Sequence, residues 1–134
     1  VTMDCVKNKV GVDKEVTSFV LPLGATINMD GTSCYQAVAA VFIANVHQMN
    51  LGLTEQLSIV LTATLASVGS AAVPGAGMVM LAIVLGHLDV PMEGIALIIG
   101  VDRVLDMCRT VVNVTGDAMV ATVIGSKFKN KLDE

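Results

Sequence analysis

The sequence predicts an all-α membrane protein in which two spanning helices, the first broken at its centre, flank a re-entrant helical hairpin. Three observations predict this fold. The 134 residues are 54% hydrophobic and only 15% charged, with a mean hydropathy of +0.74, whereas a soluble domain carries about 25% charge. Three apolar regions each exceed the roughly 20 residues that cross a bilayer. Lysines gather near the two ends of the chain.

The first apolar region, Val16 to Val46, has polar residues at its centre. The segment Asn28-Met29-Asp30-Gly31-Thr32 brings a carboxylate and a carboxamide to mid-region, where the carboxylate is costly in hydrocarbon. Gly24 and Gly31 lower the helix propensity on either side. We therefore expect a helix that breaks here, with freed backbone groups lining a polar cavity.

The second region, Leu57 to Leu88, is divided by Gly69 to Gly77, which contains Pro74 and further glycines. Proline and glycine end one helix and allow another to start. The arms, 57–68 and 78–88, each reach roughly 17 Å, about half the hydrocarbon thickness. Neither arm can cross alone, so a hairpin that enters and leaves on one side of the membrane fits best.

The third region, Ile95 to Ile124, carries polar residues at helical spacing. Positions 102, 106, 109, 113 and 117 step by 4, 3, 4 and 4, which predicts one polar face on one helix. The opposite face is apolar and suits packing against lipid or protein. The polar residues are Asp102, Asp106, Arg109, Asn113 and Asp117, with Thr110 at their edge.

The lysines predict the orientation of the chain. Lys7, Lys9 and Lys14 precede the first region, and three more follow the last, whereas the connections 48–56 and 89–94 contain no Lys or Arg. The positive-inside rule then makes both ends cytoplasmic and both connections external. This requires an even number of crossings, which two spanning helices and a re-entrant hairpin provide.

Several other classes of protein are excluded. One tyrosine, no tryptophan and a net charge of −4 argue against nucleic-acid binding. Three widely spaced cysteines predict neither a disulfide framework nor a cysteine metal site. The chain has no phosphate-binding loop and no nucleophile motif. It begins without an initiator methionine, so we expect a fragment of a longer protein.

The polar residues suggest a binding site. The permanently charged fork of Arg109 suits a carboxylate, and Asp106 could pair with an ammonium group. Asn113 and Thr110 can bind a second carboxylate. Asp117 could serve a cation, and Asp30 with Asn28 offers oxygen ligands for another. The structural alternative is a set of ion pairs, Asp106 with Arg109 and Asp102 with Arg103. Intramembrane ionisable residues favour the functional interpretation.

Three long motifs resemble the sodium-dependent dicarboxylate and glutamate symporters. They are Asn28 to Thr32, the hairpin segments 67–69 and 73–77, and Asp106 to Asp117. The resemblance implies part of an elevator-type transport domain of a homotrimer. It divides the chain into the end of a first re-entrant hairpin and a cytoplasmic connection (1–15), a broken transmembrane helix (16–49), an external loop and second re-entrant hairpin (50–90), a transmembrane helix (91–126) and a cytoplasmic tail (127–134).

The same resemblance implies roles for individual residues. Arg109 would hold the side-chain carboxylate of the substrate and Asp106 its amino group, and the remaining substrate contacts would be Thr110, Asn113, Thr32, Met29, Val73 and Gly77. One Na⁺ site would use Asp117 with backbone oxygens of Gly24, Asn28 and Asn113. A second would use backbone oxygens of Thr26, Ser67, Val68 and Ser70. A third would use Asp30 and Asn28 with ligands from outside this chain.

The implied function is Na⁺-coupled symport of aspartate or glutamate across the cell membrane, with no organic cofactor. Proton coupling and a C4-dicarboxylate substrate are close alternatives, although Asp106 would repel a dianion that lacks an amine. A structural or channel-forming membrane module is the alternative of another class. Two residues depart from the family pattern: Ala72, where many relatives have glycine, and Arg103, which we assign to an interface pair.

Overall fold

The computed structural model describes residues 1–70 and 75–132, and all regular secondary structure within them is helical. The order of the elements is α1 (Thr2–Cys5), a π-helical turn (Val6–Val10), α2 (Lys14–Ile27), α3 (Asp30–Val46), α4 (Leu53–Ser67), α5 (Ala76–Gly86), a 3-10 turn (Met92–Gly94) and α6 (Ile95–Leu132).

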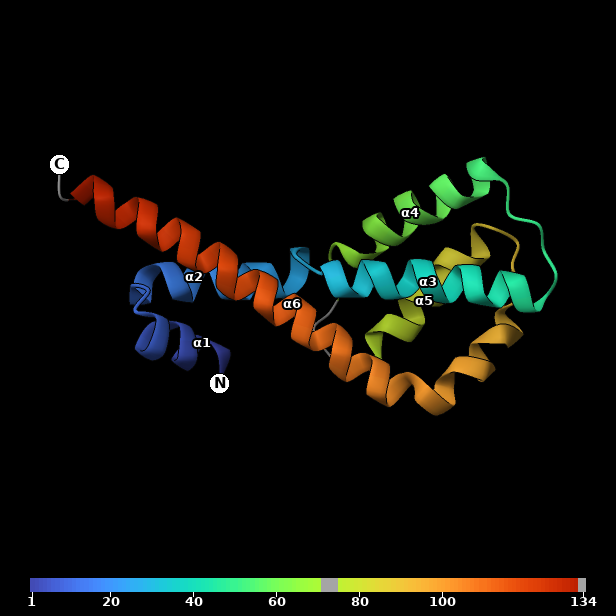
Figure 1. Cartoon of the computed structure of the whole chain (residues 1–134), viewed down its shortest axis with the longest axis horizontal. Helices are drawn as coiled ribbons and strands as arrows, with labels where there is room; N and C mark the ends of the chain where they lie inside the picture. The colour runs from blue at the N-terminus through green and yellow to red at the C-terminus, as the bar shows by residue number, and fades with distance from the viewer. Residues whose placement is uncertain (71–74, 133–134) are drawn as a thin grey trace.

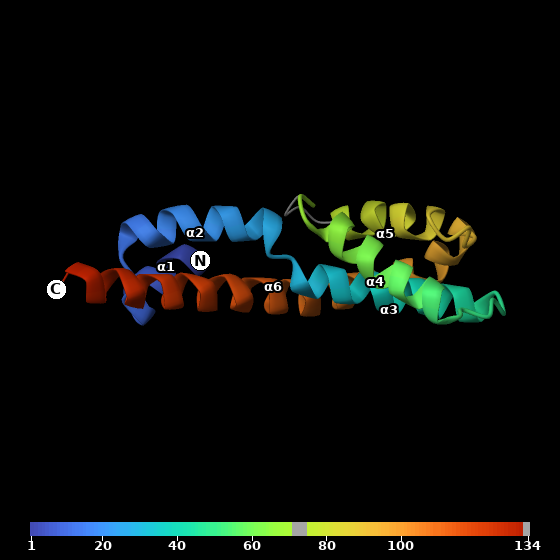
Figure 2. The same ribbon diagram turned by 90° about the horizontal axis from the view of Figure 1, so that it is seen from above.

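Helix α6 runs along the whole length of the elongated molecule and joins its two halves (Figures 1 and 2). In one half, α2 packs on the C-terminal part of α6, where Val20, Leu21 and Ala121 form a small core with Val6 and Val12. In the other half, α3, α4 and α5 share a larger core that includes Ile43, Ile59, Leu81, Leu85 and Ile98. The two cores leave the middle of α6 free to meet the junction between α2 and α3.

The first apolar region is broken where the sequence predicts. Helix α2 ends at Ile27, and Asn28 and Met29 have non-helical backbone angles before α3 begins at Asp30. A carboxylate in the first turn of α3 is favourable beside the positive end of the helix dipole. Gly31 permits α3 to touch α6, because a Cβ atom there would lie 2.6 Å from the carbonyl oxygen of Arg109.

The two arms of the hairpin are α4 and α5, which contact each other and α3. The predicted start of the first arm at Leu57 is wrong, since α4 begins at Leu53. The prediction began at the first apolar run, whereas the helix opens with a polar turn. In that turn Glu55 lies at the favourable end of the helix dipole, and the Gln56 N–H donates to the Gly52 carbonyl at 3.1 Å.

Helix α6 is longer than the sequence predicts, since it continues through residue 132, where a tail was expected from residue 127. Lysine is a good helix former and is favourable near a helix C-terminus. The predicted polar face is confirmed: Arg109 and Asp117 are buried and Asp102, Asp106 and Asn113 partly buried. On the other side the apolar side chains are exposed, including Val104, Val111 and Val112.

The sequence predicts two membrane-spanning helices. Of the helices in the described part of the chain, none combines the length and the sustained apolar character of a membrane-spanning helix.

Candidate functional site

A polar cavity of about 300 Å³ lies where the break between α2 and α3, the start of α5 and the middle of α6 meet. Three chain segments that are far apart in sequence therefore build it. Most of the predicted site residues line it. The lining residues are Ala25, Asn28, Met29, Thr32, Ser70, Ala76, Gly77, Asp106, Arg109, Thr110, Asn113, Val114 and Asp117.

Arg109 is the only cationic side chain among the described residues that line this cavity. It is only 6% exposed, and its Nη2 atom forms an ion pair with Asp106, one turn earlier on α6. Its Nη1 atom is buried and has no hydrogen-bond partner within the described residues. Leaving a donor of a buried guanidinium without a hydrogen bond costs free energy. A ligand oxygen that accepted a hydrogen bond from this guanidinium would remove that cost.

Gly77 makes room for the guanidinium. A Cβ atom at this position would overlap Nη1 of Arg109 and would lie 2.6 Å from Cζ. The first turn of α5 therefore packs its bare backbone directly against the charged group. Gly77 does line the cavity as predicted, and the structure gives the physical reason why glycine is required there.

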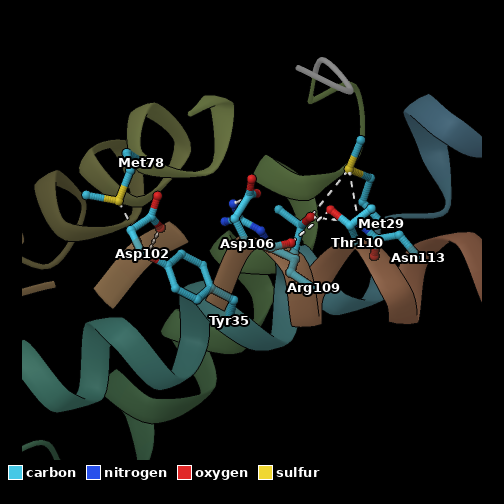
Figure 3. A network of polar contacts seen from close by, with 9 residues as sticks. Met29, Tyr35, Met78, Asp102, Asp106, Arg109, Thr110 and Asn113 are labelled. Atoms are coloured by element: carbon cyan, nitrogen blue, oxygen red, sulfur yellow. Dashed lines mark hydrogen bonds and ion pairs between the residues drawn. The ribbon is translucent and has the colours of Figure 1, made fainter. Parts of the chain in front are cut away.

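Asn113 connects α6 to α3 through both ends of its side-chain amide, and Figure 3 shows it next to Met29. Its Oδ1 atom accepts from the Gly31 backbone N–H at 2.8 Å, and its Nδ2 atom donates to Thr32 Oγ1 at 3.0 Å. The Thr32 hydroxyl in turn donates to Met29 Sδ at 3.4 Å. Thr32, Met29 and Asn113 thus form one hydrogen-bonded group. Thr110 is nearby, with its hydroxyl donating to the Asp106 carbonyl at 2.8 Å.

Asp117 lies at the break between α2 and α3. It is 6% exposed, and its Oδ1 atom accepts from Asn28 Nδ2 at 2.9 Å. Gly24 packs against the same carboxylate, because a Cβ there would come within 2.8 Å of its Cγ atom. No cationic side chain pairs with Asp117 in the described part of the chain. A buried carboxylate of this kind, with carbonyls of a broken helix nearby, suits a hard cation.

The end of α4 contacts the end of α2 by a backbone hydrogen bond, since the Gly69 N–H donates to the Thr26 carbonyl at 2.7 Å. The Ser67 carbonyl accepts from the Ser70 N–H at 3.2 Å. The four residues of the second predicted cation site therefore meet here, but two of the four carbonyls already accept an N–H group. A carbonyl oxygen has a second lone pair that remains open to a cation.

Asp30 does not line the main cavity. Its side chain is exposed and lines a second hollow of about 420 Å³ between α3 and α4, together with Ser67 and Val68. The amide of Asn28 is turned to Asp117 instead. The two carboxylates that the sequence assigned to different cations thus line different hollows, although a Cβ atom at Gly116 would lie 3.0 Å from Asn28 Nδ2 and 3.8 Å from Asp30 Oδ2. Val73 and Ala72 lie outside the described residues.

The sequence interpretation missed Tyr35. Its ring lies under the guanidinium of Arg109, with 4.5 Å between Cζ and the ring centroid. Its hydroxyl donates to Asp102 Oδ1 at 2.9 Å, so Asp102 pairs with Tyr35 and not with Arg103, which is exposed. The sequence could have indicated Tyr35, because it follows the predicted site residue Thr32 by three positions and therefore lies on the same face of the helix.

Comparison with known proteins gives a consistent result over the whole chain. Residues 1–127 match the sequence model of the sodium:dicarboxylate symporter family. The chain is 51% identical over 134 residues to excitatory amino acid transporter 3 of Oryctolagus cuniculus. It is 48% identical over 133 residues to an excitatory amino acid transporter of Caenorhabditis elegans. These matches cover 100% and 99% of this chain but 26% of each relative, so the chain spans about a quarter of their length.

Proposed function

The chain belongs to the sodium:dicarboxylate symporter family, and on that premise we propose that the full-length protein is a secondary active transporter that carries aspartate or glutamate together with Na⁺. The family is one of transporters and not of enzymes. The observation that carries the proposal is Arg109, a buried guanidinium that lines the cavity and whose Nη1 atom has no hydrogen-bond partner among the described residues.

The proposed substrate contacts follow from the charges in that cavity. The distal carboxylate of the substrate binds Arg109, whose fork can hold a carboxylate with two parallel hydrogen bonds. Asp106, which forms an ion pair with Arg109, would receive the ammonium group of the substrate. Thr110, Asn113, Thr32, Met29 and Gly77 complete the contacts, with Val73 as a further proposed contact.

Charge balance supports coupling to a cation. The described lining contains two carboxylates, Asp106 and Asp117, and one guanidinium, Arg109, so its net charge is −1. An acidic amino acid adds a further negative charge, and repulsion between like charges is stronger in a partly buried site, where the effective dielectric constant is lower than in water. Na⁺ at Asp117, with backbone oxygens of Gly24, Asn28 and Asn113, would offset that charge.

Two further Na⁺ sites are proposed. The meeting of α2 with the end of α4 supports a site at the carbonyls of Thr26, Ser67, Val68 and Ser70. The exposed carboxylate of Asp30, with Asn28 two residues before it, supports a third site that takes its other ligands from outside this chain. No organic cofactor is proposed.

The distribution of side chains supports a membrane location. Large apolar side chains are exposed on every long helix, as at Phe19, Phe42, Leu57, Val79 and Val104, whereas polar side chains such as Gln36, Ser70, Arg109 and Asp117 are buried. We propose a multi-pass protein of the plasma or inner membrane. Residues 16–49 and 91–126 would span, 50–90 would hold the re-entrant hairpin, and 1–15 would end a first hairpin. Both ends of the chain, 127–134 included, would be cytoplasmic.

The remaining proposals concern the complete protein. This chain would be part of a transport domain that moves across the membrane like an elevator, and it would supply most of the substrate and cation site. The rest of the transporter, including a scaffold domain and a first re-entrant hairpin, would lie in the other three quarters of its length, and the complete protein would be a homotrimer.

The test is uptake into liposomes that contain the purified full-length protein. Labelled aspartate, glutamate, succinate and serine are compared with a Na⁺ gradient, with a proton gradient and with neither. We expect saturable, Na⁺-driven uptake of aspartate and glutamate. Uptake driven by a proton gradient would show that the coupling ion is H⁺ and not Na⁺. A preference for succinate would show that the substrate is a C4-dicarboxylate and not an amino acid. Non-saturable flux without a gradient would indicate a channel and overturn the proposal.

The residue assignment is tested with Arg109→Cys, for which Arg103→Cys is the matched control because Arg103 is exposed on the same helix. Removal of the fork leaves a buried substrate carboxylate unpaired, which costs about 2 kcal/mol or more and corresponds to at least about a 30-fold loss of aspartate affinity. Serine, which lacks that carboxylate, should bind comparatively better. Equal aspartate affinity in Arg109→Cys and the control would make Arg109 a structural ion-pair residue.

A further inference from the structure

We propose that Tyr35 and Asp102 are positioning residues for Arg109, and that they set the preference for substrates with a distal carboxylate. The inference rests on the proposed function, because it concerns the same guanidinium. It assigns a purpose to a group of side chains that the proposed substrate and cation contacts leave out: Tyr35 of α3, Met78 of α5 and Asp102 of α6 (Figure 3).

The ring of Tyr35 supports one face of the guanidinium. The 4.5 Å between Arg109 Cζ and the ring centroid is within the range of a cation–π contact. The other contacts of the guanidinium lie along its edge, with Asp106 at Nη2 and the Gly77 backbone at Nη1. An arginine side chain has several freely rotating bonds and binds a carboxylate well only when it is held in place. The ring therefore helps to confine the orientation of the guanidinium, which lines the cavity.

Asp102 holds the ring in turn. The Tyr35 hydroxyl donates to Asp102 Oδ1 at 2.9 Å, and Asp102 precedes Arg109 by seven residues, which is two turns on the same face of α6. One rigid helix thus carries both the guanidinium and the acceptor that fixes the ring beneath it. Asp102 makes no ion pair within the described residues, so its carboxylate is available to this hydroxyl.

Met78 connects the same group to the hairpin. The Tyr35 hydroxyl lies 3.3 Å from Met78 Sδ, but it has one proton, and the nearer, charged oxygen of Asp102 is the better acceptor. The thioether is therefore a weaker packing contact. Met78 directly follows Gly77. The first turn of α5 therefore contacts both the Tyr35 hydroxyl, through Met78, and the Arg109 guanidinium, through Gly77. The position of the hairpin arm and that of Arg109 are consequently coupled through Tyr35.

The experiment measures KM and Vmax of Na⁺-driven uptake by the full-length protein in liposomes, with aspartate and serine as substrates. The variants are Tyr35→Leu, Tyr35→Phe and Asp102→Asn. Phe42→Leu is the matched control, since it removes another aromatic ring from α3 at an exposed position. Thermal unfolding of each variant reports its stability, and Tyr35→Phe retains the ring if Tyr35→Leu does not fold.

We expect Tyr35→Leu to raise the KM for aspartate by roughly 3- to 30-fold, the range of one cation–π contact, with little change in Vmax or in the KM for serine. Tyr35→Phe removes the hydroxyl that donates to Asp102, whereas Asp102→Asn keeps an oxygen acceptor and weakens the bond by removing its charge. Each should therefore have a smaller effect than Tyr35→Leu, and the double variant should be no worse than Tyr35→Phe alone. In an Arg109→Cys background, Tyr35→Leu should leave the KM for serine unchanged.

Other outcomes overturn the inference in distinguishable ways. If Arg109→Cys raises the KM for aspartate as expected but the Tyr35 and Asp102 variants do not, only the positioning role is wrong. If Tyr35→Leu raises the KM for serine as much as the KM for aspartate, whether or not Arg109 is present, Tyr35 has only a general packing role. The same conclusion follows if Phe42→Leu raises the KM for aspartate as much as Tyr35→Leu does. If Arg109→Cys leaves aspartate uptake unchanged, the proposed function fails and this inference fails with it.

Discussion

Gly77→Ala should disable the substrate site while leaving the fold almost unchanged. The added Cβ would lie 2.6 Å from Cζ of Arg109 and 2.9 Å from Nη2, whereas carbon atoms pack at about 3.5 Å or more. Because Nη1, the nearest atom, would overlap the new Cβ, the guanidinium must move by more than about 1 Å. It stands at the end of a long, flexible side chain, so it can move without displacing a helix. The substrate carboxylate would then lose hydrogen bonds to a charged donor.

The expected size of the effect follows from that loss. Hydrogen bonds to charged groups contribute about 1.5–3 kcal/mol, so the KM for aspartate should rise on the order of 10- to 100-fold. Alanine gains up to about 1 kcal/mol over glycine in a helix, which offsets the strain of the displaced arginine. The midpoint of thermal unfolding should consequently change little.

Two other glycines provide matched comparisons for the same Gly→Ala change. At Gly31 the new Cβ would lie 2.6 Å from the backbone carbonyl of Arg109, so α3 and α6 must separate and stability should fall by about 1–3 kcal/mol. At Gly100 nothing lies within 4 Å, so neither stability nor uptake should fall. The assay pairs aspartate uptake into liposomes with thermal unfolding in detergent. An unchanged KM in Gly77→Ala, or a loss of stability as large as in Gly31→Ala, would refute the reasoning.

Two further predictions concern buried polar groups. Asp117→Asn should weaken the Na⁺ dependence of aspartate binding but keep the fold, because an amide oxygen can still accept from Asn28; Na⁺ activation equal to that of the wild type would count against the cation site. Gln36 is fully buried and its amide has no partner within the described residues, so Gln36→Leu should stabilise the protein by about 1–3 kcal/mol. A lower midpoint of thermal unfolding would mean that the rest of the protein supplies a partner.

Features of a single helix could be predicted from the sequence. The break near Asn28 followed from polar residues and glycines inside an apolar run, and the polar face of α6 followed from the spacing of Asp102, Asp106, Arg109, Asn113 and Asp117. These features depend on local backbone geometry and helical periodicity. The start of α4 could not be predicted in this way: the helix begins four residues before the expected Leu57, because a polar turn opens it.

The partners of those residues could not be predicted in the same way. The sequence left Asp106 open as either an ammonium ligand or a partner of Arg109, and only the structure provides the ion pair, the unpartnered Nη1 atom and the Tyr35 ring beneath the guanidinium. The structure likewise shows that Asp30 lines a different hollow from the cavity that contains Asp117.

The physical reason is the range of the interactions involved. The sequence alone determined where helices break and which side chains share a face, because residues three or four apart on one helix are always neighbours. The hydrogen bond from Gly31 to Asn113 joins residues 82 positions apart, and the distance between them depends on how closely α3 can approach α6. That distance is set by the bare backbone of Gly31 and the packing of both helices, which only the tertiary structure decides.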